Sequence, residues 1–266
     1  MAKVKIISDG ASDLSPQLIK EYDIAIVPFY INLGGKILKD MVEVDAQGIY
    51  DFVDKTGVLP GTVACSIGDF KDEYTKWREQ GYEVVCVTIG SGFSCSFQNA
   101  VIAAEDMDGV YIIDSQNLSS GEGHVVLNAG ILAKQGMDAA SIAKELEVLR
   151  TKVRASFIID TLDYMKKGGR CSSVELLGAN LLKIRPEICV ENGAMKVGNK
   201  GRGVLSKVIE EYVNRRLTEC GPLRTDRIFI THTGCSGEIV DMVREQIEKN
   251  IHFDEITETI ASGLIT

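Results

Sequence analysis

At 266 residues the chain is long enough for one large domain or two modest ones. Its formal net charge of −9, from 29 Lys and Arg against 38 Asp and Glu, argues against a nucleic-acid-binding protein, because phosphate contacts need a basic face. There is no apolar run of membrane-spanning length and no signal peptide, and seven cysteines without a regular framework favour a reducing compartment, so we expect a cytoplasmic protein without a stable membrane anchor.

Strands and helices alternate along the first half of the sequence. Apolar, β-branched runs predict strands at 3–8, 25–33, 83–89 and 110–114, although Pro28 marks an edge or an irregularity in the second. Capping and periodicity signals predict helices that begin after Ser15, near Ala46, after Ser66, near Ser96, near Gly123 and after Asp138. This alternation over 1–150 indicates a parallel sheet with helices on both faces.

The second half of the sequence has a different order of elements. A strand at 155–160 and a helix that ends near Arg170 are followed by an Asn192-Gly193 hairpin signal within 188–197, a strand at 227–231 and helices at 206–219 and 237–249. We therefore predict a two-domain α/β protein. Its parts are an N-terminal α/β domain at 1–152 and a C-terminal α+β domain with a mixed sheet at 153–266, and the C-terminal end suggests a truncated chain.

The segment 83–100 (EVVCVTIGSGFSCSFQNA) is the most informative part of the chain. A buried strand leads into a glycine–serine loop and then a helix, whose first N–H groups lack partners within the helix and carry partial positive charge. Ser91, Ser94 and Ser96 add hydroxyl donors, so this junction predicts a site for a small negatively charged group. Two further segments, 60–66 and 168–173, combine loop residues with hydroxyl or cationic side chains next to a helix.

These segments, in this order, resemble the DegV family of fatty-acid-binding proteins. The segment 8–14 resembles the family's Thr-Asp-Ser-x-Ser-Asp-Leu, and the segment 62–66 resembles its Thr-Ser-Gln-Pro-Ser. The segment 90–100 resembles its Ser-Ser-x-Leu-Ser-Gly-Thr-Tyr-Gln-Ser-Ala. Three later matches are to Asp-Ser, to Leu-x-Tyr-Leu-x-Lys-Gly-Gly-Arg and to Leu-x-Ile-Lys-Pro. The matching segments are 8–14 (SDGASDL), 62–66 (TVACS), 90–100 (GSGFSCSFQNA), 114–115 (DS), 161–170 (TLDYMKKGGR) and 182–186 (LKIRP).

The resemblance implies a protein that sequesters one long-chain fatty acid, such as palmitate, stearate or oleate, and needs no other cofactor. It implies that Thr62 and Ser94 hold the carboxylate and that Arg170 lies near the head group. It also implies a non-catalytic carrier in bacterial lipid metabolism, which presents the acid to a separate fatty-acid kinase for acyl-phosphate formation. The chain departs from the family pattern at Gly10, which replaces a serine, and at Cys95, which replaces a glycine.

Two other interpretations stay open at this point. One is a small-metabolite kinase or transferase with a polar pocket, for which His232 is the best proton-transfer candidate, although a structural role for this histidine is favoured. The other is a thiol or metal site formed by Cys65, Cys95 and Cys171. No pair of these cysteines has Cys-x-x-Cys spacing, so we favour their being small apolar pocket fillers and expect no metal.

Overall fold

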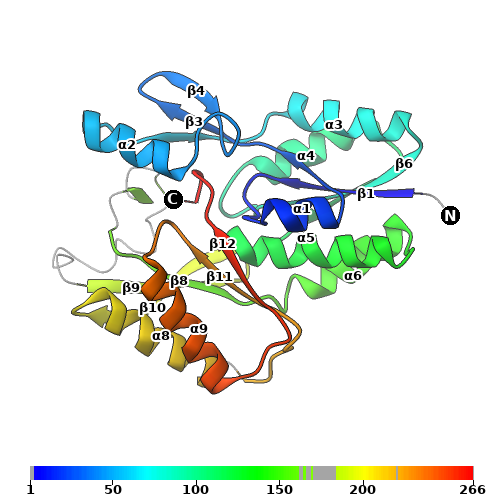
Figure 1. Cartoon of the computed structure of the whole chain (residues 1–266). Coiled ribbons are helices and arrows are strands. Elements are labelled where there is room, and N and C mark those ends of the chain that lie inside the picture. The colour runs from blue at the N-terminus through cyan, green and yellow to red at the C-terminus, as the bar shows by residue number, and fades with distance from the viewer. Residues whose placement is uncertain (1–2, 162–163, 166–168, 170–183, 220, 266) are drawn as a thin grey trace. The chain divides into compact units, whose positions relative to one another are not determined.

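The computed structural model describes the chain except residues 1–2, 162–163, 166–168, 170–183, 220 and 266 (Figure 1). The chain divides into two compact units. Unit 1 comprises Met1–Ala155 with two short later segments, Glu191–Ala194 and Ala261–Thr266, and unit 2 comprises Ser156–Val190 and Met195–Ile260. The main break lies three residues beyond the predicted boundary at 152, and the segments that return to unit 1 have no signal in the sequence.

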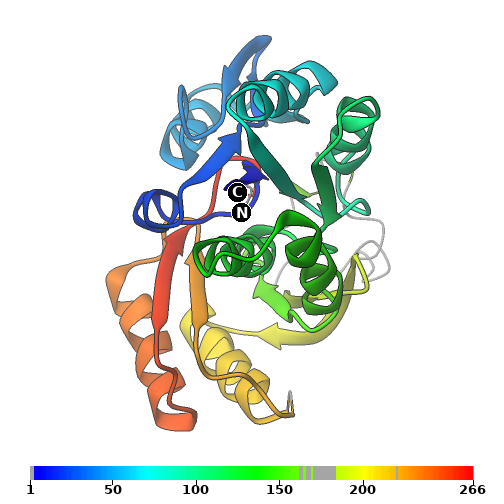
Figure 2. The same cartoon turned by 90° about the vertical axis from the view of Figure 1, so that its right-hand side faces the viewer.

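Unit 1 is built on a parallel sheet with the strand order β2-β1-β6-β7. Helices α3 and α4 cover one face and α5 and α6 cover the other, as the cyan and green helices of Figure 2 show, so the middle strands are buried on both sides. This confirms the predicted parallel sheet. The elements are β1 Lys3–Asp9, α1 Pro16–Glu21, β2 Ile24–Val27, α3 Ile67–Glu79, β6 Tyr82–Thr88, α4 Ser96–Ala104, β7 Val110–Asp114, α5 Ser119–Lys134 and α6 Ala139–Leu149.

A second, antiparallel sheet in unit 1 corrects one sequence prediction. The single strand expected at 25–33 is in fact two strands, because the chain leaves the parallel sheet at Pro28, which has no N–H for a ladder hydrogen bond. The second piece, β3 (Tyr30–Leu33), lies between β4 (Lys36–Lys39) and β5 (Gly61–Val63). Helix α2 (Ala46–Thr56) connects β4 toward β5 and begins at the Asp45 cap.

Unit 2 has a three-stranded sheet in the order β10-β9-β8 and a parallel pair, β11 and β12. Asn192 and Gly193 form the predicted hairpin turn between β9 and β10, with positive φ angles of 52° and 73° that suit a type I′ turn. Strand β12 was not predicted. The elements are β8 Ala155–Ile158, β9 Ile184–Glu191, β10 Ala194–Arg202, α8 Leu205–Glu219, β11 Ile228–His232, α9 Gly237–Asn250 and β12 Ile256–Ile260.

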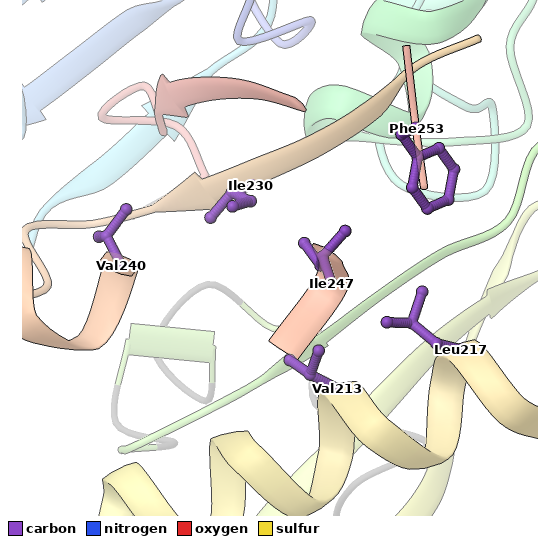
Figure 3. Close-up of a cluster of buried hydrophobic side chains, with 6 residues drawn as sticks. All are labelled: Val213, Leu217, Ile230, Val240, Ile247 and Phe253. Carbon is purple, nitrogen blue, oxygen red and sulfur yellow. The ribbon is translucent and has the colours of Figure 1, made fainter. Parts of the chain in front are cut away.

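An apolar core cluster of unit 2 lies between helices α8 and α9 and the β11–β12 pair. Figure 3 shows side chains from α8, α9 and β11 gathered together with the aromatic ring that precedes β12. The spacing of four residues on α8 and of seven on α9 places each helix's contributors on one face. The six buried residues are Val213, Leu217, Ile230, Val240, Ile247 and Phe253.

Candidate functional site

The loop at residues 90–96, hereafter the serine loop, connects β6 to α4 at the carboxyl end of the parallel sheet. Its first residue, Gly90, donates its N–H to the carbonyl oxygen of Asn117 over 2.7 Å. A Cβ atom at Gly90 would lie 3.1 Å from the backbone nitrogen of Asn117 and 3.0 Å from the ring of Phe93, so a larger residue would require these neighbours to shift. The serine loop is therefore packed tightly against the connection between β7 and α5.

Two of the three serines that were predicted to donate to an anion already donate to carboxylates of the protein. Ser91 donates both its N–H and its hydroxyl to Asp114, over 3.0 and 2.6 Å. Ser96 is fully buried and donates its hydroxyl to Asp9 over 2.6 Å. A hydroxyl has one hydrogen to donate, so neither Ser91 nor Ser96 can also donate to a ligand carboxylate in this arrangement.

Ser94 differs from the other two serines. It is half-buried, and its Oγ accepts the backbone N–H of Ser96 over 3.2 Å, so it satisfies one of the first amides of α4. In the described part of the chain, the Ser94 hydroxyl hydrogen has no protein acceptor. Ser94 is thus the serine of this loop that can donate to a bound anion.

Thr62 lies in the edge strand β5 rather than in the loop that the sequence suggested. It pairs with Ile31 across the β3–β5 ladder, and its side chain is exposed. Its segment lies beside the start of α4, because Asn99 donates its side-chain amide to the carbonyl oxygen of Cys65 over 2.8 Å. The predicted segments 62–66 and 90–100 therefore meet in unit 1. Arg170 lies outside the described residues.

Two buried acids, Asp9 and Glu122, lie close together in unit 1, and Asp9 contacts the serine loop. Asp9, at the end of β1, accepts hydrogen bonds from Ser96, from the N–H of Ile89 and from the N–H of Ala11. Glu122, in the first turn of α5, accepts the Ser8 hydroxyl over 3.1 Å. Burial raises the pKa of both acids, and the charge of Asp9 raises that of Glu122 further, whereas the three donors oppose the rise at Asp9. The hydrogen-bond donors therefore favour the ionised form at Asp9 more than at Glu122.

Two more buried acids, Asp13 and Asp40, bind the returning segment 261–266 within unit 1. Asp13 accepts the N–H of Ser262 over 2.8 Å, and Asp40 accepts the N–H groups of Gly263 and Leu264 over 3.0 and 2.8 Å. Burial raises the pKa of Asp13 to about 7 and also raises that of Asp40. Sequence reasoning missed these contacts, since nothing in a linear sequence pairs residue 13 or 40 with a segment more than 200 positions away.

The contacts of the cysteines and of His232 bear on the two alternative interpretations. Cys65 is buried, which raises the pKa of its thiol, whereas Cys95 is exposed and Cys171 lies outside the described residues. No cluster of three or more His, Cys, Asp or Glu side chains in the described ranges is arranged to hold a metal ion.

Both ring nitrogens of His232 are engaged in unit 2. The N–H groups of Gly234 and Cys235 donate to its Nδ1, each over 3.2 Å, and its Nε2 lies 3.3 Å from a carboxylate oxygen of Glu258. Both nitrogens therefore have protein partners, as a structural role for this histidine requires. Over the ranges that the structure covers, no helix has the length and apolar character to cross a membrane.

Comparison with known proteins identifies the family. A family model described as "Uncharacterised protein, DegV family" matches residues 3–266. A DegV domain-containing protein of Clostridium perfringens is 31% identical over 217 residues, which are 80% of this chain and 78% of the relative.

Solved structures agree with this result. A Thermus thermophilus DegV family protein, described by its fatty acid binding, has a TM-score of 0.87 at 25% identity and covers 100% of this chain and 94% of its own. A Thermotoga maritima protein, whose structure is said to reveal a fatty acid binding function, has a TM-score of 0.85 at 27% identity, with 100% and 95% covered. The chain therefore belongs to the DegV family.

Proposed function

We propose that this protein binds one long-chain fatty acid, such as palmitate, stearate or oleate, and that Thr62 and Ser94 hold the carboxylate. One observation carries the proposal. Ser94 keeps a hydroxyl hydrogen for an external acceptor at a helix N-terminus, and the Cys65–Asn99 contact brings the Thr62 segment beside the same helix. The fatty acid binding described for the Thermus and Thermotoga relatives, at 25% and 27% identity, supports it.

The physical roles of the two ends of such a ligand differ. A tail of about 14 methylenes, at ~0.8 kcal/mol for each one buried, contributes at most about 11 kcal/mol. Each hydrogen bond to the ionised head group contributes about 1.5–3 kcal/mol. The tail therefore supplies most of the affinity, and the hydroxyls of Thr62 and Ser94 select an acid over a neutral head group.

The protein acts in this proposal as a non-catalytic carrier in the bacterial cytoplasm. It presents the carboxyl group to a separate fatty-acid kinase, which forms the acyl phosphate, and it needs no cofactor besides its lipid. The motif resemblance supports the kinase step, and the engaged ring of His232 gives no support to the alternative of a transferase that uses this histidine. Acyl phosphate should form only when loaded protein, ATP and a bacterial fatty-acid kinase are all present.

The binding step has a direct test. Native mass spectrometry and lipid extraction of the purified protein should reveal one co-purifying long-chain fatty acid. The double substitution Thr62→Val with Ser94→Ala should weaken palmitate binding at least tenfold, because it removes two hydrogen bonds to a charged group. Hexadecanol, which has the same tail and a neutral head, should lose less affinity. An empty protein with no measurable palmitate affinity would contradict the proposal.

A further inference from the structure

Asp9 holds both ends of the serine loop. Its Oδ2 accepts the N–H of Ile89 over 3.0 Å just before the loop and the hydroxyl of Ser96 over 2.6 Å at its last residue. Its Oδ1 accepts the N–H of Ala11 over 3.2 Å, which fixes the carboxylate to its own strand end. Because Asp9 is fully buried at the end of a central strand, it is a rigid reference point for the loop.

Ser96 transmits this constraint to Ser94. Its hydroxyl donates to Asp9, and its backbone N–H donates to Ser94 Oγ over 3.2 Å. That N–H occupies one lone-pair direction of the Ser94 oxygen, so the Ser94 hydroxyl hydrogen is directed elsewhere. The orientation of the proposed ligand donor therefore depends on where Ser96 sits, and Asp9 determines where Ser96 sits.

The charge of the buried pair suits this role. Burial and the nearby Asp9 charge raise the pKa of Glu122, whereas three hydrogen-bond donors oppose the rise at Asp9, so the ionised form is favoured at Asp9. A charged acceptor makes stronger hydrogen bonds than a neutral one, and two of the donors that Asp9 holds belong to the ends of the loop.

We infer that Asp9 is a positioning residue which, through Ser96, aims the Ser94 hydroxyl at the ligand and thereby sets the preference for an ionised acid over a neutral head group. This inference rests on the proposed function, since it names what determines head-group choice at the same site. Asp9 itself does not contact the ligand in this scheme. A purely structural role for Asp9 would instead affect the binding of every lipid equally.

The test measures the ratio of affinities for palmitate and hexadecanol at pH 7.5, by competition against one fluorescent lipid so that the affinity of the probe cancels. Asp9→Asn offers one acceptor oxygen in place of two, and Ser96→Ala removes the connecting hydroxyl. Each should lower the acid-to-alcohol ratio about tenfold, the same effect that we expect for Ser94→Ala, because each removes or misdirects one hydrogen bond to a charged group. Adding Asp9→Asn to Ser94→Ala should lower the ratio no further.

Ser119→Ala is the matched control. Ser119 donates to the buried Asp13 over 2.6 Å, the same distance as the bond from Ser96 to Asp9, but it has no bond to Ser94. The ratio should stay within about twofold of the unmodified protein in this variant, because the Ser94 hydrogen bond is intact.

Equal losses for acid and alcohol, or additive losses in the double variant, would overturn the inference. If Asp9→Asn fails to fold, Ser96→Ala alone decides in the same way. Failure of the proposed function has a different signature, since the unmodified protein would then bind neither lipid or would not prefer the acid.

Discussion

The two units stabilise buried acids in opposite ways. In unit 2, Glu187 is 2% exposed and pairs with Arg215 and, over 3.7 Å, with Arg216. Burial alone would raise the pKa of Glu187, but the hydrogen bond and charge of Arg215 outweigh it and the pKa is lowered. In unit 1, Asp9 and Asp13 accept hydrogen bonds from neutral N–H and O–H groups, and burial raises their pKa values.

The groups that donate to a buried acid determine what that acid can hold in place. Glu187 is stabilised mainly by the charge of long arginine side chains, with one backbone N–H, that of Asn199, donating to it over 3.3 Å. A carboxylate that accepts backbone N–H groups fixes the course of the chain itself. The acids of unit 1 lie at the carboxyl ends of parallel strands and in the following loops, which is where ligands of open α/β sheets commonly bind. Asp9 in this way joins the two ends of the serine loop, whereas Asp13 binds the segment 261–266.

Removing a cation from unit 2 should give the largest effect. Arg215→Met leaves the buried Glu187 with Arg216, at 3.7 Å, as its remaining cationic partner among the described residues, and removal of one member of a buried ion pair costs about 3–5 kcal/mol. The free energy of unfolding, from urea titration at pH 7, measures this loss. The double variant Glu187→Gln with Arg215→Met should lose less than the single variant, because the uncompensated charge is gone. Equal losses of unfolding free energy in the single and the double variant would show that the packing of these side chains, and not their charges, sets the stability.

Asp13 should give the opposite pH response from Glu187. Its folded-state pKa of about 7 exceeds the ordinary value of 3.8, so between these values the folded protein binds more protons than the unfolded chain. Stability should therefore fall as pH rises through this window, by up to about 1.4 kcal/mol per pH unit from this group. Urea titrations from pH 4.5 to 7.5 on the unmodified protein and on Asp13→Asn would isolate the contribution of Asp13 to the pH dependence of stability. An unchanged slope in Asp13→Asn would refute the assignment.

Glu122→Gln should give the smallest effect. Because burial and the charge of Asp9 raise the pKa of Glu122 and favour its neutral form, glutamine is a close match in shape and charge, and we expect a change of less than about 1 kcal/mol at pH 7. The same exchange at Glu187 removes a charge paired with two arginines and should cost more. If Glu122→Gln proved the more damaging of the two, the contrast between the units would be wrong.

The sequence predicts those features that depend on neighbouring residues. The Ser66–Asp69 capping box, the Asp138 cap and the Asn192-Gly193 turn are all present, because their physics is confined to a few consecutive residues. The sequence could not show that Pro28 separates two sheets or that Thr62 lies in an edge strand, since both depend on pairing with distant segments.

The candidate site shows the same limit. Ser91, Ser94 and Ser96 look equivalent in the sequence, and only the positions of Asp114 and Asp9 distinguish them. Asp9 lies 87 positions from Ser96 and Glu122 lies 114 from Ser8, so no local pattern could reveal these bonds. Strand β12 was missed because three consecutive polar residues, 257–259, separate its two isoleucines, so the segment shows neither an apolar run nor an apolar–polar alternation.

The return of residues 261–266 to unit 1 has a consequence for synthesis on the ribosome. Asp13 and Asp40 emerge early, but their backbone partners lie 223 to 249 positions later in the chain. During elongation both carboxylates must remain hydrated, and the first unit cannot reach its final packing before translation of the second is finished. The packing around Asp13 and Asp40 is therefore completed only after residues 262–264 have been synthesised.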